Sequence, residues 1–258
     1  MLAMLQWYEA AGVDMAVGEE PVDRFAQSAI VPAVPRTAPA PAAMRDAPPH
    51  PAIAASGADA DPETARALAA KAQTLDSLRE TLENFDGCGL KLRATNLVFA
   101  DGNPEAEIML VGEAPGRDED LQGKPFVGRS GQLLDRMLKS IGLDRTKVYI
   151  ANTVPWRPPG NRTPAPSEVA VCLPFLHRQI ELVAPKVLVT LGGASASTLF
   201  ETTVGITRIR VQWRDLTING HTMRAIATLH PAYLLRQPAA KRLAWQDLLA
   251  VRKALNET

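Results

Sequence analysis

The sequence predicts an α/β fold, a three-layer α/β/α sandwich around a central, mainly parallel sheet of four strands. Two observations support this fold class. Short apolar runs with β-branched members alternate with longer segments in which apolar residues recur every three or four positions. The apolar runs also lack the polar alternation of a strand that faces water, so helices are expected to cover both faces of the sheet.

The expected elements follow one another in a strand-helix order. The predicted strands are residues 106–112, 148–153, 186–192 and 223–229. The predicted helices are residues 65–83, 130–141, 167–183, 194–200 and 239–255. An Asn219-Gly220 turn predicts a hairpin just before the fourth strand, because this pair favours the left-handed backbone of a two-residue turn.

The first part of the chain differs from the rest. Residues 1–12 have the apolar spacing of a short helix, whereas residues 31–62 consist mostly of alanine, proline, aspartate and glycine. A segment of that composition cannot bury a core. We therefore expect an N-terminal helix plus a mobile linker over residues 1–62 and one folded domain over residues 63–258. Whether the helix docks a partner or is simply a poorly ordered leader stays open.

The net charge of zero hides an asymmetry along the chain. Residues 1–63 hold three arginines and nine acidic residues, which leaves 25 basic and 19 acidic residues in the remainder. A mildly basic body is compatible with a nucleic-acid partner, although many other enzymes share it. No stretch reaches the roughly 20 apolar residues of a membrane span. The N-terminus lacks the basic start of a secretory signal, so the sequence predicts a cytoplasmic protein.

Four loops follow directly after the four predicted strands. In a parallel sheet the carboxyl ends of the strands share one edge, and ligands bind there. The loops are residues 112–116, 152–156, 192–195 and 230–233. They are rich in glycine, proline and polar side chains, so this edge is the predicted site.

The first loop continues to residue 132 and carries acidic, aromatic and glycine residues. Backbone N–H groups near Gly128, at a helix start, could hold a phosphate. An acidic surface loop with an ordinary turn is the alternative. The loop has neither the phosphate-binding pattern of nucleoside triphosphatases nor a dinucleotide fingerprint.

The second and third loops offer polar groups of a different kind. Asn152 presents a donor beside an acceptor, which complements the edge of a uracil. Arg157 and Arg162 could meet phosphates, and Gly193 with Ser195 could bind an anion at a helix start. The alternatives are that Asn152 caps a turn and that the glycines allow tight packing.

The fourth loop contains a histidine that is held by the following proline. His230 is expected at the site edge, although a lone histidine is often structural. Tyr233 and Leu234 lie beside Arg236, and apolar residues flanked by basic ones fit a wedge that enters DNA stacking. The alternative is that they start the last helix and pack inward.

These motifs together resemble the uracil-DNA glycosylase superfamily, most closely its family 4, or thermophile-type, enzymes. The resemblance runs from about Leu82 to Leu249 through TNLVFADGNPEAEIMLVGEAPGRDEDLQGKPFVGRSGQLLDRML, VYIANTVPWRPPGNRTPAPSE and TLHPAYLLRQPAAKRLAWQDL. It implies an α/β sandwich that flips uracil out of DNA and hydrolyses its bond to the sugar during base excision repair. The implied partner is uracil-containing DNA. We expect a monomer, with a possible protein partner for the N-terminal segment.

The resemblance also implies roles for individual residues. Glu113 and Glu119, the latter especially, are expected to position or activate water or to support the charged transition state. The Ala114 backbone contacts the base, and Phe126 stacks on it. The residues expected to contact DNA are Gly128, Arg129, Ser130, Arg157, Arg162, Gly193, Ser195, Tyr233, Leu234 and Arg236.

Recognition of the base falls to three side chains under this resemblance. Asn152 reads the uracil edge, and His230 bonds uracil O2 as negative charge builds on the leaving base. Cytosine is excluded because it presents a donor where uracil has O4, and Phe126 is expected to crowd the thymine methyl group. Two alternatives stay open: a glycosylase for other deaminated bases such as hypoxanthine or xanthine, and a catalytically silent DNA-binding homologue.

One departure from the family concerns its cofactor. Family 4 enzymes usually bind a [4Fe-4S] cluster through four cysteines, and this chain has two, Cys88 and Cys172. Phe85 and Trp156 stand at the other two positions. Two thiolates are too few for an ordinary cluster. We therefore predict no metal and no other cofactor, an apolar plug in the place of the cluster, and a divergent branch of the family.

Overall fold

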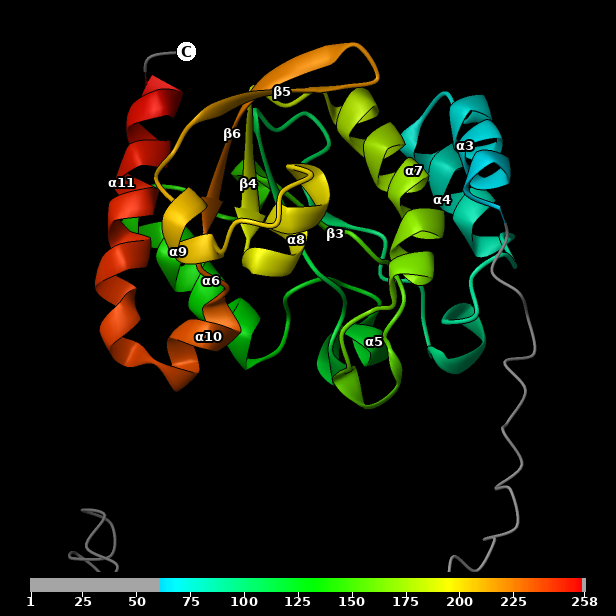
Figure 1. The fold of residues 1–258 in the computed structure, drawn as a ribbon, viewed down its shortest axis with the longest axis horizontal. Helices are drawn as coiled ribbons and strands as arrows, with labels where there is room; N and C mark the ends of the chain where they lie inside the picture. The colour runs from blue at the N-terminus through cyan, green and yellow to red at the C-terminus, as the bar shows by residue number, and fades with distance from the viewer. Residues whose placement is uncertain (1–60, 257–258) are drawn as a thin grey trace, which may run out of the picture. The chain divides into compact units, whose positions relative to one another are not determined.

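A computed structural model describes residues 61–256, and the predicted N-terminal helix and linker lie outside this range (Figure 1). Six strands form one sheet in the order β1-β3-β2-β4-β6-β5. Their bounds are Asp101–Gly102 for β1, Ile108–Gly112 for β2, Tyr149–Asn152 for β3, Val187–Leu191 for β4, Arg214–Ile218 for β5 and His221–Thr228 for β6.

The four inner strands are parallel, as predicted. Val111 of β2 lies opposite Ala151 of β3 and Thr190 of β4, and Thr190 in turn faces Ala227 of β6. The predicted number of four strands is too small, because an antiparallel strand borders the sheet on each side. β5 is the first arm of the predicted hairpin, and β1 has only two residues, too few for a periodic pattern.

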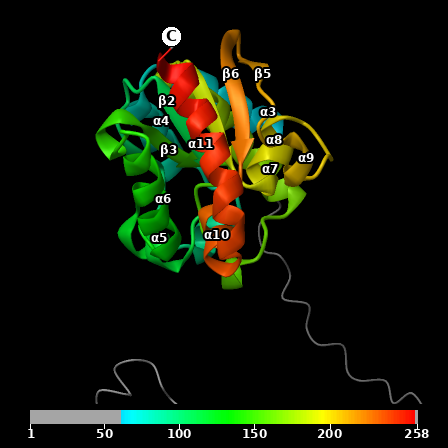
Figure 2. The same ribbon diagram turned by 90° about the vertical axis from the view of Figure 1, so that its left-hand side faces the viewer.

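Helices cover both faces of the sheet (Figure 2). The α-helices are α3 Pro62–Lys71, α4 Leu75–Glu83, α5 Arg117–Gln122, α6 Arg129–Ser140, α7 Pro166–Val183, α8 Gly193–Leu199, α9 Ile206–Ile209, α10 Pro231–Arg236 and α11 Lys241–Asn256. Ile108 and Leu110 of β2 pack with α6 and α11 on one face, whereas Met109 and Val111 pack with α7 and α8 on the other. Alternate side chains of β2 thus enter two cores, one on each face of the sheet, and this confirms the predicted three layers.

The predicted helix over residues 65–83 is two helices, α3 and α4. The first helix ends at Lys71. Thr74 caps the second, because its hydroxyl accepts the backbone N–H of Ser77 at 3.1 Å and the Ser77 hydroxyl accepts that of Thr74. This reciprocal cap stabilises a new helix start against continuation of α3. Short 3-10 turns also occur, at Lys91–Arg93, Arg145–Lys147, Pro159–Asn161 and Pro238–Ala240.

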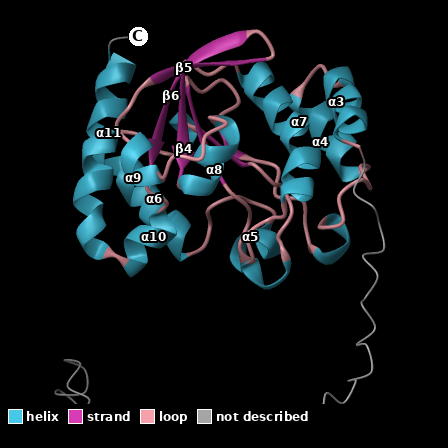
Figure 3. Ribbon diagram, in the orientation of Figure 1, coloured by secondary structure: helices cyan, strands magenta, loops and turns pink. Residues whose placement is uncertain are grey.

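The loops after the parallel strands gather at one edge of the sheet, as the sequence predicts (Figure 3). Two short helices that the sequence did not predict, α5 and α10, lie in these loops. No helix between residues 61 and 256 is both long and apolar enough to span a bilayer.

A buried ion pair ties the last helix to the sheet. Asp247 of α11 is fully buried and accepts Arg210 Nη2 at 2.8 Å, while the Thr228 hydroxyl donates to the same carboxylate at 2.7 Å. Arg210 is 8% exposed and also donates to the carbonyl of Leu243. The Asp247 carboxylate thus accepts three hydrogen bonds, from Arg210 and Thr228, so its loss leaves the buried charge of Arg210 uncompensated.

We predict that Asp247→Ala lowers the free energy of unfolding by about 3–5 kcal/mol, because the Arg210 charge stays buried without its carboxylate. Thermal or denaturant unfolding measures the change. Arg66→Ala removes an exposed pair with Glu63 and serves as the control, with an expected change below about 1 kcal/mol. Equal shifts for the two variants would contradict a stabilising role of the buried pair.

Candidate active site

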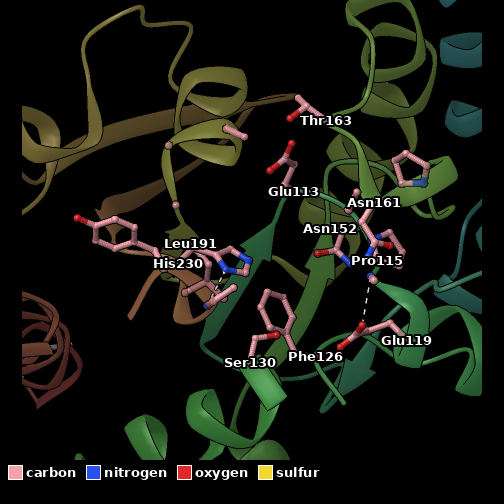
Figure 4. A pocket seen from close by; sticks show the side chains of 18 of the residues that line it. Glu113, Pro115, Glu119, Phe126, Ser130, Asn152, Asn161, Thr163, Leu191 and His230 are labelled. Atoms are coloured by element: carbon pink, nitrogen blue, oxygen red, sulfur yellow. Dashed lines mark hydrogen bonds between the residues drawn. The ribbon is translucent and has the colours of Figure 1, made fainter. Parts of the chain in front are cut away.

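A cavity of about 490 Å³ opens at the carboxyl edge of the parallel strands (Figure 4). All four predicted loops line it, and the 158–163 segment adds a further wall. Asn152, Phe126 and His230 lie around this one cavity, so the structure brings together the three side chains expected to enclose a base. The sequence predicted all three through the family resemblance, from loops that follow three different strands.

His230 begins α10 and its imidazole orientation is fixed by the backbone. The N–H of Ala232 donates to Nδ1 at 3.1 Å, so the proton of the neutral ring belongs on Nε2. Burial and then the charge of Arg236 lower the pKa of His230 to about 4. The ring is therefore a neutral donor at physiological pH. Gly192, at φ 102°, makes room for it, since a Cβ there would come within 2.9 Å of His230 Cβ.

The Phe126 ring forms a flat apolar wall of the cavity. Its centroid lies 5.5 Å from that of His230, with 32° between the ring planes. A Cβ on Gly112, the last residue of β2, would lie 2.7 Å from Phe126 Cζ. The aromatic ring therefore packs directly on the strand end, where only glycine leaves space.

Asn152 ends β3 and is 6% exposed. Within residues 61–256, its amide oxygen has no hydrogen-bond partner. A buried acceptor without a donor costs about 1–3 kcal/mol. Such a group at a cavity wall points to a ligand that brings a donor.

Glu119 of α5 makes backbone contacts that the sequence did not predict. Its carboxylate accepts the backbone N–H groups of Gly116 at 3.1 Å, Val127 at 3.0 Å and Gly128 at 2.9 Å. These bonds occupy both oxygens and hold two turns together. Glu119 also lines the cavity, so its expected part in catalysis stays a prediction. The Gly128 N–H is not available for a phosphate because Glu119 already binds it.

Glu113 directs its carboxylate into the cavity from the end of β2 (Figure 4). Burial raises the pKa of Glu113, and a hydrogen bond from Thr163 opposes this effect. Asn161, on the same side of the cavity, has left-handed backbone with φ 56°, and Arg157 Nε donates to its amide oxygen at 2.7 Å. Its amide nitrogen remains as a donor. We did not predict Asn161 or Thr163 as site residues, although the Gly160-Asn161 pair is a typical signal for a left-handed turn.

Some of the residues predicted to contact DNA are accessible at the site, and others are not. The cavity is lined by four of them, Ser130, Gly193, Tyr233 and Arg236, of which Tyr233 is 40% exposed. Arg129 is exposed at the start of α6.

The structure corrects several of the remaining predictions. Leu234 is 1% exposed and packs in the core against α6, so the alternative that it turns inward is right. Ser195 is fully buried and donates to the carbonyl of Gly192. Arg157 donates to Asn161, and Arg162 forms two bonds with Glu168, at 2.8 and 2.6 Å. Neither arginine is buried and Arg162 also lines the cavity, so their contacts with DNA stay predictions.

The region around the two cysteines is an apolar cluster. Cys172 Sγ lies 3.7 Å from Cys88 Sγ, and both residues are buried. Phe85 packs on Phe175 at 4.9 Å between ring centroids, and Trp156 is 2% exposed in the same cluster. No group of three or more His, Cys, Asp or Glu suited to a metal occurs within residues 61–256. Two thiols beside aromatic rings do not fit a four-iron cluster, which needs four ligands.

Comparison with known proteins gives consistent results. The family described as the uracil DNA glycosylase superfamily matches residues 99–249. The type-4 uracil-DNA glycosylase of Archaeoglobus fulgidus is 44% identical over 171 residues, which cover 64% of this chain and 85% of that protein. The type-4 enzyme of Thermotoga maritima is 40% identical over 182 residues, which cover 68% of this chain and 92% of the relative. That of Saccharolobus solfataricus is 39% identical over 187 residues, covering 70% and 87%.

The surroundings of His230 predict its titration. We expect the imidazole to stay neutral, with the proton on Nε2, until the pH falls to about 4, because burial disfavours the charged ring. Nitrogen-15 NMR of labelled histidine measures both the pKa and the tautomer, and His230→Gln identifies the signal. A midpoint near the ordinary value of about 6.5, or a proton on Nδ1, would contradict this assignment.

Proposed function

The chain belongs to the uracil-DNA glycosylase superfamily, and on this premise we propose that it hydrolyses the N-glycosidic bond of uracil in DNA. One observation carries the proposal: an amide, an aromatic ring and a neutral imidazole surround one cavity at the sheet edge. This combination suits a flat, polar-edged base that has been turned out of the DNA stack.

Recognition of the base rests on Asn152 and Phe126. The unpartnered amide oxygen of Asn152 accepts uracil N3–H, and its amide nitrogen donates to O4. Cytosine offers the opposite groups at these positions, at a cost of about 1–3 kcal/mol for each unpaired buried group. Phe126 stacks on the base and limits space beside C5, and the Ala114 backbone completes the wall.

Departure of the base is assisted by His230. As the bond to the sugar breaks, negative charge accumulates on uracil O2. The Nε2–H of a neutral imidazole donates a hydrogen bond to that oxygen and stabilises the anion without transferring a proton. A fixed donor of this kind needs little reorganisation during the reaction.

The water that attacks the sugar is assigned to the wall formed by Glu113 and Asn161. The Glu113 carboxylate accepts a proton of the water, and the Asn161 amide nitrogen donates to its oxygen. The same carboxylate offsets positive charge on the sugar. Glu119 acts indirectly, because it holds the turns that shape the cavity.

The DNA backbone is proposed to cross the mouth of the cavity. Arg129 and Arg236 supply positive charge beside Ser130, Gly193 and Tyr233. The proposed enzyme acts as a monomer in the cytoplasm. The proposal includes no cofactor, because Phe85 and Trp156 occupy the positions where a cluster would need cysteines.

Single-turnover cleavage of uracil in single- and double-stranded oligonucleotides tests this function. We expect abasic product from the wild type and a loss of about 10²–10³-fold in rate for His230→Ala, since one donor to a developing anion is removed. Asn152→Ala is expected to lose activity as well. Lys139→Ala, on the outer part of α6, is the control and keeps the wild-type rate.

Other outcomes of this assay point elsewhere. Faster cleavage of hypoxanthine or xanthine than of uracil would mean that the enzyme acts mainly on other deaminated bases. Binding without any cleavage would favour a silent DNA-binding homologue. Wild-type rates in both His230→Ala and Asn152→Ala would overturn the assigned roles.

The proposed roles also predict the pH dependence of the cleavage rate. Lowering the pH protonates Glu113 at a pKa above its ordinary value, so the rate should fall on the acidic side, and Glu113→Gln should remove that limb at a lower plateau. His230 should add no limb near its ordinary pKa of about 6.5. A rate that rises about tenfold per pH unit on acidification would instead indicate a charged imidazole.

A further inference from the structure

Phe126 has a backbone conformation that aromatic residues rarely adopt. Its φ is 54°, in the left-handed region. A bulky residue in this region costs about 1–3 kcal/mol, and it persists only where surrounding groups impose it. The strain is at the residue whose ring forms the stacking wall of the cavity.

Arg145 binds the two carbonyl groups that flank this strained residue. Its Nη1 donates to the carbonyl of Pro125 at 3.1 Å, and its Nη2 donates to the carbonyl of Phe126. Arg145 belongs to the 3-10 turn that precedes β3 and is not among the residues that line the cavity. It therefore reaches the site only through the backbone at 125–126.

The Arg145 guanidinium is itself fixed from two other elements. Nη1 also contacts Asp101 of β1 at 2.6 Å, and Nε contacts Asp135 of α6 at 2.8 Å. One planar group thus joins a strand, a helix and the turn of Phe126. Lysine cannot replace it, because an ammonium group lacks this planar, multi-directional donor geometry.

Two glycines leave the space that Phe126 occupies. A Cβ on Gly131 would lie 1.6 Å from the carbonyl oxygen of Phe126, and one on Gly112 would lie 2.7 Å from the Phe126 ring. The backbone and ring of Phe126 are therefore confined by close contacts. The hydrogen bonds from Arg145 determine where the peptide lies within that space.

We propose that Arg145 is a positioning residue of the glycosylase, which sets the plane of the Phe126 ring against the flipped base. The inference rests on the proposed function for its effect on catalysis. Arg145 does not touch the base or the sugar, so it acts only through Phe126. A displacement of about 1 Å in a stacking group can slow a reaction by about 10²-fold.

A double-mutant cycle separates this role from general stabilisation. Arg145→Lys should slow single-turnover cleavage by about 10- to 100-fold, while affinity for DNA with an uncleavable uracil analogue stays within about threefold. In a Phe126→Leu background the same substitution should change the rate by less than about twofold, because the group it acts through is gone. Lys147→Ala, in the same 3-10 turn, is the control and leaves the rate unchanged.

Two results of the cycle would overturn the proposal. An equal loss of rate in both backgrounds would mean that Arg145 acts on the fold in general. An unchanged rate in Arg145→Lys with intact Phe126 would mean that the ring needs no such support.

A measurement that does not depend on cleavage tests this inference separately from the proposed function. Fluorine-19 NMR of protein labelled with 4-fluorophenylalanine reports on each of the six phenylalanines, and Phe126→Leu identifies one signal. Arg145→Lys should shift the Phe126 signal and leave the other signals in place. An unmoved Phe126 signal would refute the inference. If Arg145→Lys shifts the Phe126 signal as expected but the wild type cleaves no uracil, the proposed function alone is refuted.

Discussion

The carboxylate of Glu119 is the constraint on which the cavity depends, because three backbone N–H groups from two separate turns converge on it. One turn carries Gly116 and the other follows Phe126. Arg145 binds the carbonyl groups of the second turn, so an anion holds its donors and a cation holds its acceptors. Backbone polarity, satisfied from both sides, fixes the stacking ring more firmly than apolar packing alone would.

The cavity separates its charges in a way that matches the proposed reaction. In the proposed reaction the departing base contacts the uncharged side chains of His230 and Asn152, and the carboxylate of Glu113 lies toward the sugar. Burial produces both states, since it keeps the imidazole neutral and raises the pKa of the carboxyl group. A charged imidazole at the same place is disfavoured by burial and by the charge of Arg236, and the Glu119 carboxylate opposes these effects without reversing them.

The sequence was sufficient for the parallel strands and for the meeting of their loops, because apolar runs and the rules of parallel sheets are local and general. Through its resemblance to a known family, it also predicted that Asn152, Phe126 and His230 lie around one cavity. It could not reveal that Glu119 binds three backbone groups, since this depends on how the chain after Phe126 folds back. The inward direction of Leu234 likewise follows from the packing of α10 on the core that includes α6. Both features depend on tertiary contacts, which local sequence does not reveal.

The bond between the Ala232 N–H and His230 Nδ1 has a consequence for how this site can evolve. The atom that assigns the imidazole proton belongs to the main chain and not to a neighbouring carboxylate or amide. Every amino acid except proline provides that atom, so replacements at position 232 leave the tautomer unchanged. The backbone conformation therefore determines which imidazole nitrogen donates, and substitutions of the surrounding side chains do not change it.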